Sequence, residues 1–228
     1  SSAFEGCTNL AEVNFSNGLQ TISSYAFERT KLSSVELPDG LLTISGSAFT
    51  GCSELRNFDY PIGWTTAGSN IFYNCPKLTK IAVPEGAIKI PDSAFYGMNQ
   101  LTEISFPSTL NEIGSASFKS CVGLTKVEIP ANVTVIGSSA FEYCTGLKEI
   151  SLPDGLLNIK SYAFEGCAAL TEVKLPNSIT TIGGGAFSGC TNMKKWNYPI
   201  NLTTTGSSIL YNCSKLTNIV IPEGVTAI

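Results

Sequence analysis

The sequence predicts a curved, right-handed solenoid of ten stacked 23-residue units, with a parallel β-sheet on its concave side. Three repeating columns of residues indicate this fold. The eight cysteines, at positions 7, 52, 75, 121, 144, 167, 190 and 213, are separated by 45, 23, 46, 23, 23, 23 and 23 residues. Phenylalanine recurs with nearly the same spacing from Phe4 to Phe187, and proline from Pro38 to Pro222. Self-similarity with a period of about 20 to 50 residues is typical of solenoids.

The first element of each unit is a short β-strand. In the unit that begins at Leu147, apolar residues stand at Leu147, Ile150 and Leu152, and Pro153 follows. The alternation of Ile150 and Leu152 favours an extended chain, and the proline ends the strand because it has no N–H to donate. Stacked units then place each strand parallel to the next, about 4.8 Å away.

A tight turn, a second extended stretch and a compact turn complete the unit. Pro153-Asp154-Gly155 suits a tight turn, because proline presets its φ and glycine accepts a positive one. Residues 156–159 are extended again and lead into residues 161–167, which are long enough for one helical or 3₁₀ turn. The predicted class is α/β, mostly parallel β-structure with short helical or 3₁₀ turns.

Two units depart from the cysteine pattern, and neither end of the sequence looks different from the middle. Met98 takes a cysteine position, and the segment 27–32 is one residue shorter than its counterparts. Solenoids usually carry polar capping repeats at their ends. We therefore expect residues 1–228 to form a single domain that is a fragment of a longer chain. Uncapped turns expose unpaired strand edges, which predicts end-to-end self-association.

The cysteine column could be a metal site, a disulfide framework or part of the core. Zinc needs ligands that converge tetrahedrally, and a straight column of single cysteines without histidine does not supply them. Met98 in a cysteine position indicates that the position needs an apolar side chain. The sequence therefore predicts eight free, buried thiols, no metal and no cofactor.

The aromatic residues are predicted to lie in the core. The phenylalanine column stacks ring on ring when units lie in register. A smaller set of aromatic residues could be exposed platforms for sugars, but each member stands in a core position of its unit. This set is Phe58, Tyr60, Trp64, Trp196 and Tyr198.

Composition excludes several classes of function. The chain has no histidine, which removes the commonest general base and metal ligand. A net charge of −4 argues against nucleic acid as a partner. No apolar run is long enough to insert into a membrane within this segment.

The outward column of the strands is the best candidate for binding a partner. Its charges alternate in sign along part of the stack. One interpretation is therefore that opposite charges on neighbouring strands pair with each other and the surface binds no partner. The other is a mixed-charge concave face that receives a protein or another surface macromolecule. The candidate residues are Lys80, Glu103, Lys126, Lys148, Glu149, Glu172, Lys174, Lys194 and Lys195.

The unit as a whole has the pattern L-x-x-I-x-L-P-x-x-L-x-x-I-x-x-x-A-F-x-x-C, as in Leu147 to Cys167. It closely resembles the BspA-like (Treponema-type) leucine-rich repeat, and the resemblance covers essentially the whole chain. It implies a leucine-rich-repeat solenoid and a cell-surface or secreted, extracellular protein that acts in adhesion to host proteins or neighbouring cells. It implies no catalytic residues.

Two other functions remain open. A structural spacer would use the same regular units to hold a binding domain away from a surface. A carbohydrate-active enzyme on a β-solenoid is disfavoured, because only four aspartates exist and two of them lie in Pro-Asp-Gly turns.

Overall fold

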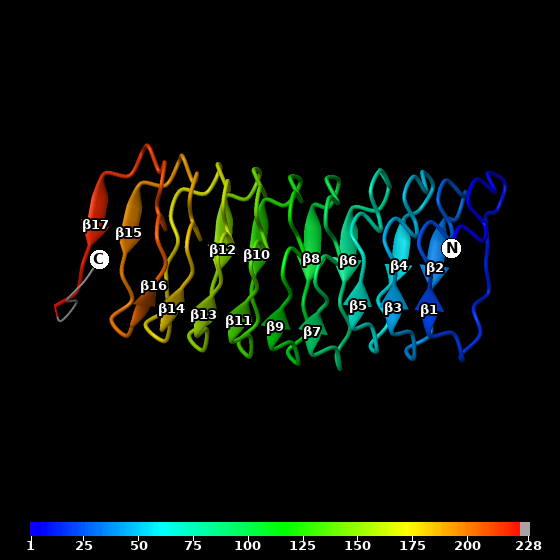
Figure 1. Cartoon of the computed structure of the whole chain (residues 1–228), viewed down its shortest axis with the longest axis horizontal. Helices are drawn as coiled ribbons and strands as arrows, with labels where there is room; N and C mark the ends of the chain where they lie inside the picture. Colours follow the sequence, from blue (N-terminus) through cyan, green and yellow to red (C-terminus); the bar gives the residue numbers. More distant parts are fainter. Residues whose placement is uncertain (224–228) are drawn as a thin grey trace.

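The computed structural model describes residues 1–223 and shows a long, narrow stack of chain turns that advances steadily from one end to the other (Figure 1). Leu10 and Leu216 are the first and last of the ten leading positions, and nine turns of the chain separate them. The predicted count of ten units is therefore close to the number of turns observed. The described residues contain no helix that is long and apolar enough to cross a membrane. The predicted solenoid is confirmed.

Most turns of the stack contribute a longer strand on one side and a shorter strand on the other (Figure 1). Partners in neighbouring strands are one unit apart: Lys126 lies beside Glu149, and Val127 beside Ile150. The 23-residue register and the parallel direction are therefore confirmed. The longer strands are β2 (Ser34–Glu36), β4 (Asn57–Asp59), β6 (Lys80–Ala82), β8 (Glu103–Ser105), β10 (Lys126–Glu128), β12 (Glu149–Ser151), β15 (Lys195–Asn197) and β17 (Asn218–Val220).

The second extended stretch of the unit also pairs from turn to turn. Its strands form a six-stranded sheet from β7 to β16 and a three-stranded sheet of β1, β3 and β5. These shorter strands are β1 (Thr21–Ile22), β3 (Thr43–Ile44), β5 (Thr66–Ala67), β7 (Lys89–Ile90), β9 (Glu112–Ile113), β11 (Val135–Ile136), β13 (Asn158–Ile159), β14 (Thr181–Ile182) and β16 (Thr204–Thr205).

The longer strands do not form one continuous sheet. They pair two at a time, as β2–β4, β6–β8, β10–β12 and β15–β17, and residues 172–174 are not paired as a strand. Within a pair, the N–H groups of Lys148 and Glu149 both donate to the carbonyl of Thr125. Between β8 and β10 no such bonds form among the described residues, so the strand edges face each other across a gap. Sequence periodicity sets the register but does not distinguish paired from unpaired neighbours.

The predicted helical or 3₁₀ turn at residues 161–167 is replaced by a chain of tight turns. Tyr162 and Gly166 have φ of 60° and 69°, which a right-handed helix does not accommodate. The N–H groups of Tyr162, Phe164 and Gly166 donate to carbonyls of the next unit, over distances of 2.8 to 3.0 Å. A helix would use these donors within the segment, whereas here they join successive units. This correction means that backbone hydrogen bonds link the units on the turn side too.

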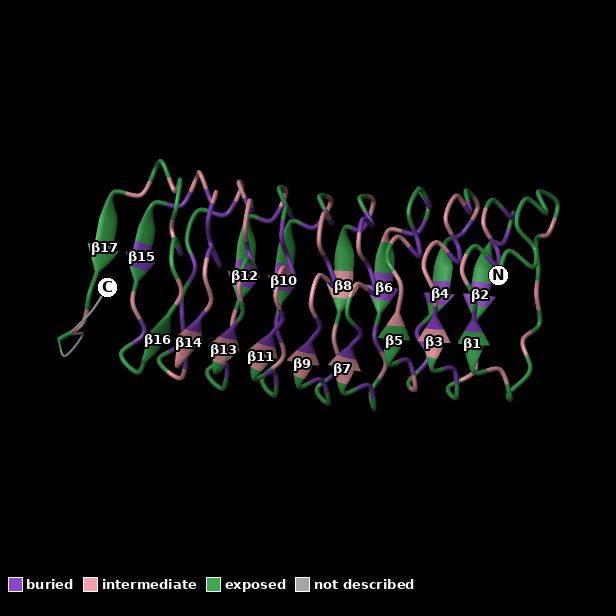
Figure 2. Cartoon of the chain, in the orientation of Figure 1, coloured by how far each residue is buried: buried purple, intermediate pink, exposed green. Residues whose placement is uncertain are grey.

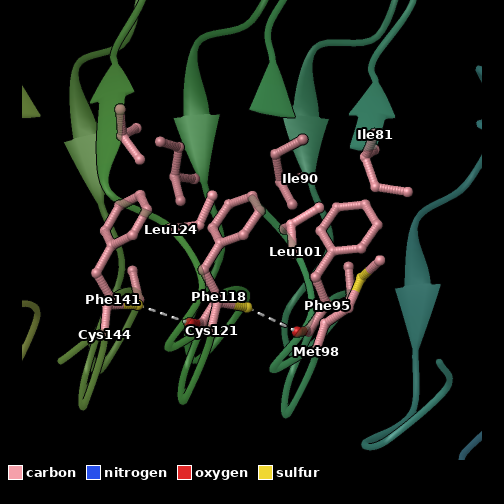
Figure 3. Close-up of a cluster of buried hydrophobic side chains, with 14 of the residues drawn as sticks. Ile81, Ile90, Phe95, Met98, Leu101, Phe118, Cys121, Leu124, Phe141 and Cys144 are labelled. Atoms are coloured by element: carbon pink, nitrogen blue, oxygen red, sulfur yellow. Dashed lines mark hydrogen bonds between the residues drawn. The ribbon is translucent and has the colours of Figure 1, made fainter. Parts of the chain in front are cut away.

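The core is a set of stacked columns that run along the solenoid (Figure 3). Phe118, Phe141 and Phe164 are fully buried, and their ring centroids are 5.2 and 5.4 Å apart with nearly parallel planes. Phe4, at the first turn, is the exposed exception. Of the aromatic residues that could have been sugar platforms, four are buried and one is half-buried, which confirms their core positions. These are Phe58, Tyr60, Trp64 and Trp196, with Tyr198 half-buried.

Candidate interaction surface

The exposed side chains of the longer strands, of the residue directly before each of them and of the equivalent residues 171–174 form one side of the solenoid, which we call the strand face. In β12, Glu149 and Ser151 point to solvent on either side of the buried Ile150, and most of the other longer strands alternate in the same way (Figure 2). All nine candidate residues are exposed, so the structure places them on a surface that a partner can reach.

Four of the candidate residues form ion pairs with each other. Lys80 contacts Glu103 at 2.7 Å, and Lys126 contacts Glu149 at 3.4 Å, in both cases between partners in strand register. Lys126 also contacts Glu128 at 2.9 Å, and this contact, more than the one with Glu149, raises the pKa of Lys126. These pairs are exposed and screened by water, so they contribute little to stability. For these four residues, the interpretation that the charges of the surface pair with each other holds.

The other five candidate residues form no ion pair within the described part of the chain. Four of them are lysines that belong to three successive units: Lys148, Lys174, Lys194 and Lys195. Glu172 is the only carboxylate among the five. Their charges sum to +3 in a chain whose net charge is −4. We call the four lysines the basic end of the strand face. Its positive charge remains available to a partner with negative charge.

A cleft opens on the strand face where β8 and β10 fail to pair. It has a volume of about 470 Å³ and combines charged side chains with Ile104 and Phe106, which are both half-buried. Sequence reasoning placed Glu103 and Lys126 on this face but missed the cleft. The cleft depends on a missing backbone ladder, for which the periodic pattern carries no signal.

The cysteine column consists of free thiols, as predicted. Six of the eight are buried, but Cys7 is exposed and Cys213 is half-buried, so the prediction of eight buried thiols is wrong for these two. Each lies in a turn near an end of the described stack, where fewer neighbouring turns cover it. Among the described residues, no group of three or more cysteine, aspartate or glutamate side chains could hold a metal ion.

The thiols also form hydrogen bonds that the sequence did not indicate. Cys144 donates to the carbonyl of Phe118 at 3.1 Å, and Cys121 to that of Phe95 at 3.2 Å (Figure 3). Met98 has no S–H to donate. At its position Gln100 donates to the equivalent carbonyl, Phe72 O, at 3.2 Å. From Cys52 to Cys213, each thiol of the column donates to a phenylalanine carbonyl of the preceding unit, and Gln100 replaces the thiol where Met98 stands.

Gln100→Ala should destabilise the protein by about 1 kcal/mol, because it removes the donor to Phe72 O. The same change in a Met98→Cys background should cost nearly nothing, because the new thiol replaces the donor. Urea denaturation of the two single variants and the double variant measures this coupling. Equal costs of Gln100→Ala in both backgrounds would contradict the assigned role of Gln100.

Glu142 and Glu165 place two carboxylates from adjacent units on the turn side. Glu142 is almost fully buried and contacts Lys119 at 2.8 Å, and this contact raises the pKa of Lys119. Burial, followed by the charge of Glu142, raises the pKa of Glu165 in the next unit. Since Glu142 is held by an ammonium group, this cluster stabilises adjacent turns.

The family model for "BspA type Leucine rich repeat region (6 copies)" matches residues 1–85, 20–148 and 111–228, which together cover the whole chain. The chain belongs to this family. The resemblance seen in the repeat pattern is therefore confirmed. Curated protein sequences gave no match.

Solved structures of leucine-rich repeat proteins share the fold of this BspA-type chain. A protein from Bacteroides ovatus is 28% identical with a TM-score of 0.70, and the match covers 96% of this chain and 63% of that one. The Treponema pallidum protein is 29% identical with a TM-score of 0.52, over 82% and 78% of the two chains. The pneumococcal vaccine antigen PcpA is 26% identical with a TM-score of 0.53, over 88% and 59%. The chain thus spans less than two thirds of the B. ovatus protein.

Proposed function

We propose that this BspA-type domain is a non-enzymatic interaction module, secreted or at the cell surface, that binds host or neighbouring-cell macromolecules through its strand face. The observation that carries the proposal is the basic end of that face. Lys80, Glu103, Lys126 and Glu149 neutralise each other, whereas the lysines of the basic end have no carboxylate partner within residues 1–223. A surface that only had to be soluble would not need charge concentrated in one part of the strand face.

The chemistry of the strand face favours a protein partner with an acidic patch. Carboxylates of the partner would meet the basic end, and an apolar side chain could enter the cleft against Ile104 and Phe106. Charge complementarity of this kind speeds association and selects partners. Members of the family are generally non-enzymatic, and the likeness to PcpA, a vaccine antigen, supports an extracellular or cell-surface location.

Reversing charge at the basic end should weaken binding. We expect the triple variant Lys174→Glu, Lys194→Glu, Lys195→Glu to adhere to cultured epithelial cells at least about tenfold less than the wild type, a loss of about 1.4 kcal/mol. Fluorescently labelled protein and flow cytometry at several salt concentrations measure this, and the wild-type signal should fall as salt rises.

A matched control changes three exposed lysines outside the strand face, Lys31, Lys160 and Lys215, to glutamate. This variant has the same net charge as the first and should adhere as the wild type does. Equal losses in both variants would show that only net charge matters. No adherence by the wild type to any cell surface would favour the structural spacer.

A further inference from the structure

One junction between successive units differs from all the others on the turn side. At a regular junction, three N–H groups of one turn segment donate to carbonyls of the next unit, as Phe27 N–H does to Ala48 O. Eight of the nine junctions in residues 1–223 carry all three bonds. The junction between the segments around Phe72 and Phe95 carries none. The N–H of Asn70 and the carbonyl of Tyr96 lie on its two sides, and neither has a backbone partner across it.

The same junction is open on the other sides of the solenoid. β5 does not pair with β7, and β4 does not pair with β6. Pro91 contributes directly, because it stands where Gly68 and Gly114 donate their N–H to the preceding unit. Apart from the turn where the chain passes from one unit into the next, in which Leu78 N–H donates to Cys75 O, no backbone hydrogen bond joins the unit that begins at Leu55 to the unit that begins at Leu78.

Side chains hold this junction at its wider spacing. The indole of Trp64 packs edge-on against Phe95, at 5.9 Å between centroids. The rings of Phe72 and Phe95 are 6.3 Å apart, compared with 5.2 Å for Phe118 and Phe141. Two hydrogen bonds then span the junction: Tyr60 Oη donates to Lys89 O at 3.1 Å, and Gln100 Nε2 donates to Phe72 O. The opening is thus fixed by packing, so a binding site there would already be formed before a ligand arrives.

A cleft of about 400 Å³ lies over this junction on the turn side. Its lining holds two tyrosines from neighbouring units, three hydroxyl groups and two amides, with no charged side chain. Gly97, with φ of 74°, lies beneath the ring of Tyr73, where a Cβ would be 3.7 Å from Tyr73 Cδ2 and 2.9 Å from Asn70 Oδ1. The absence of a side chain at this glycine leaves room for both groups. The lining residues are Ser47, Thr50, Asn70, Tyr73, Tyr96, Gly97, Asn99 and Ser120.

We propose that this cleft binds a neutral oligosaccharide. Tyr73 is 47% exposed, and its ring offers an apolar surface to the C–H face of a sugar ring. The amides of Asn70 and Asn99 donate and accept hydrogen bonds, as sugar hydroxyl groups do. The unpaired backbone N–H and carbonyl at the junction add a donor and an acceptor. With no cation or carboxylate in the lining, neither an acidic glycan nor a charged peptide finds a complementary partner.

Exposed tyrosines elsewhere on the turn side lack these features. The rings of Tyr143 and Tyr162 also lie over glycines of the next unit, Gly166 and Gly185. Their junctions are closed by the backbone bonds described above. Tyr143 also has the ammonium of Lys119 5.8 Å from its ring centroid. An exposed tyrosine is therefore common on this side, and the open junction is what distinguishes the exposed Tyr73 and the half-buried Tyr96.

Isothermal titration calorimetry of the full chain tests the proposal, using gluco-, manno-, xylo- and N-acetylglucosamine oligosaccharides and an oligogalacturonate as the acidic comparison. We expect at least one neutral series to bind and the acidic one not to. Tyr73→Ala and Tyr96→Ala should each weaken that binding at least tenfold. Tyr162→Ala removes an exposed tyrosine at a closed junction and should leave it unchanged. Circular dichroism confirms that each variant is folded.

Three results would overturn the proposal: no binding by any neutral series, stronger binding of the acidic oligosaccharide, or an equal loss in Tyr162→Ala. The cleft is separate from the strand face, so the Lys174, Lys194 and Lys195 variant should bind the oligosaccharide as the wild type does. The two proposals can therefore fail independently.

Discussion

Phe141→Ala should lower the free energy of unfolding by about 3–5 kcal/mol. Phe141 is fully buried, and its ring stacks between those of Phe118 and Phe164, so truncation leaves a cavity inside a continuous column. Figure 3 shows the Phe118 side of this stack. The regular backbone ladders on both sides limit how far the units can collapse into that cavity. Urea denaturation followed by circular dichroism measures the loss.

Phe4→Ala is the matched control for this experiment. Phe4 belongs to the same column and stacks on Phe27 at 5.2 Å, but it is 44% exposed. Because less apolar surface is lost and little cavity forms, its cost should be well below that of Phe141→Ala. Similar costs for the two variants would show that burial in the column does not determine stability.

The protein should lose stability steeply as pH rises above about 9. Burial raises the pKa of Cys144 to about 12, from an ordinary value near 9, and it raises the pKa of Cys121, Cys167 and Cys190 as well. The folded chain keeps these protons over a range in which the unfolded chain loses them. The contribution of these thiols to the free energy of unfolding is therefore fully present below pH 9. Above pH 9 it falls by about 1.4 kcal/mol per pH unit for each such thiol.

Urea denaturation in the presence of a reductant between pH 8 and 10 measures this slope, mostly below the range in which tyrosines and lysines titrate. Cys144→Met, which copies the natural Met98, removes one titrating thiol and should reduce the slope by about 1.4 kcal/mol per pH unit. A free energy of unfolding that does not change from pH 8 to 10 would contradict the buried, protonated state of the thiols.

Part of the open junction could have been suspected from the sequence. Pro91 stands at a position filled by residues with an N–H in the other units, and Trp64 is larger than its counterparts such as Leu41 and Leu156. Either change alone only weakens one contact. Whether the whole ladder opens depends on how Trp64 packs against Phe95 in the next unit, and that contact joins residues 31 positions apart.

The candidate binding residues show a similar division. Alternating charges in the outward column predicted pairs, and Lys80–Glu103 and Lys126–Glu149 do pair. The periodic pattern did not reveal that Lys126 would also bond Glu128 within its own strand, or that β8 and β10 would separate. These outcomes depend on side-chain conformations and on small differences in the spacing between strands.

The sequence by itself determined the solenoid, the 23-residue register, the core columns and the exposure of the charged strand face. It could do so because in-register stacking gives every position of the repeat the same surroundings in each unit. Only the tertiary structure decided which neighbouring units share backbone hydrogen bonds, which lysines remain unpaired and where clefts open. Those features arise where units differ from one another, and their outcome depends on contacts between side chains of adjacent turns.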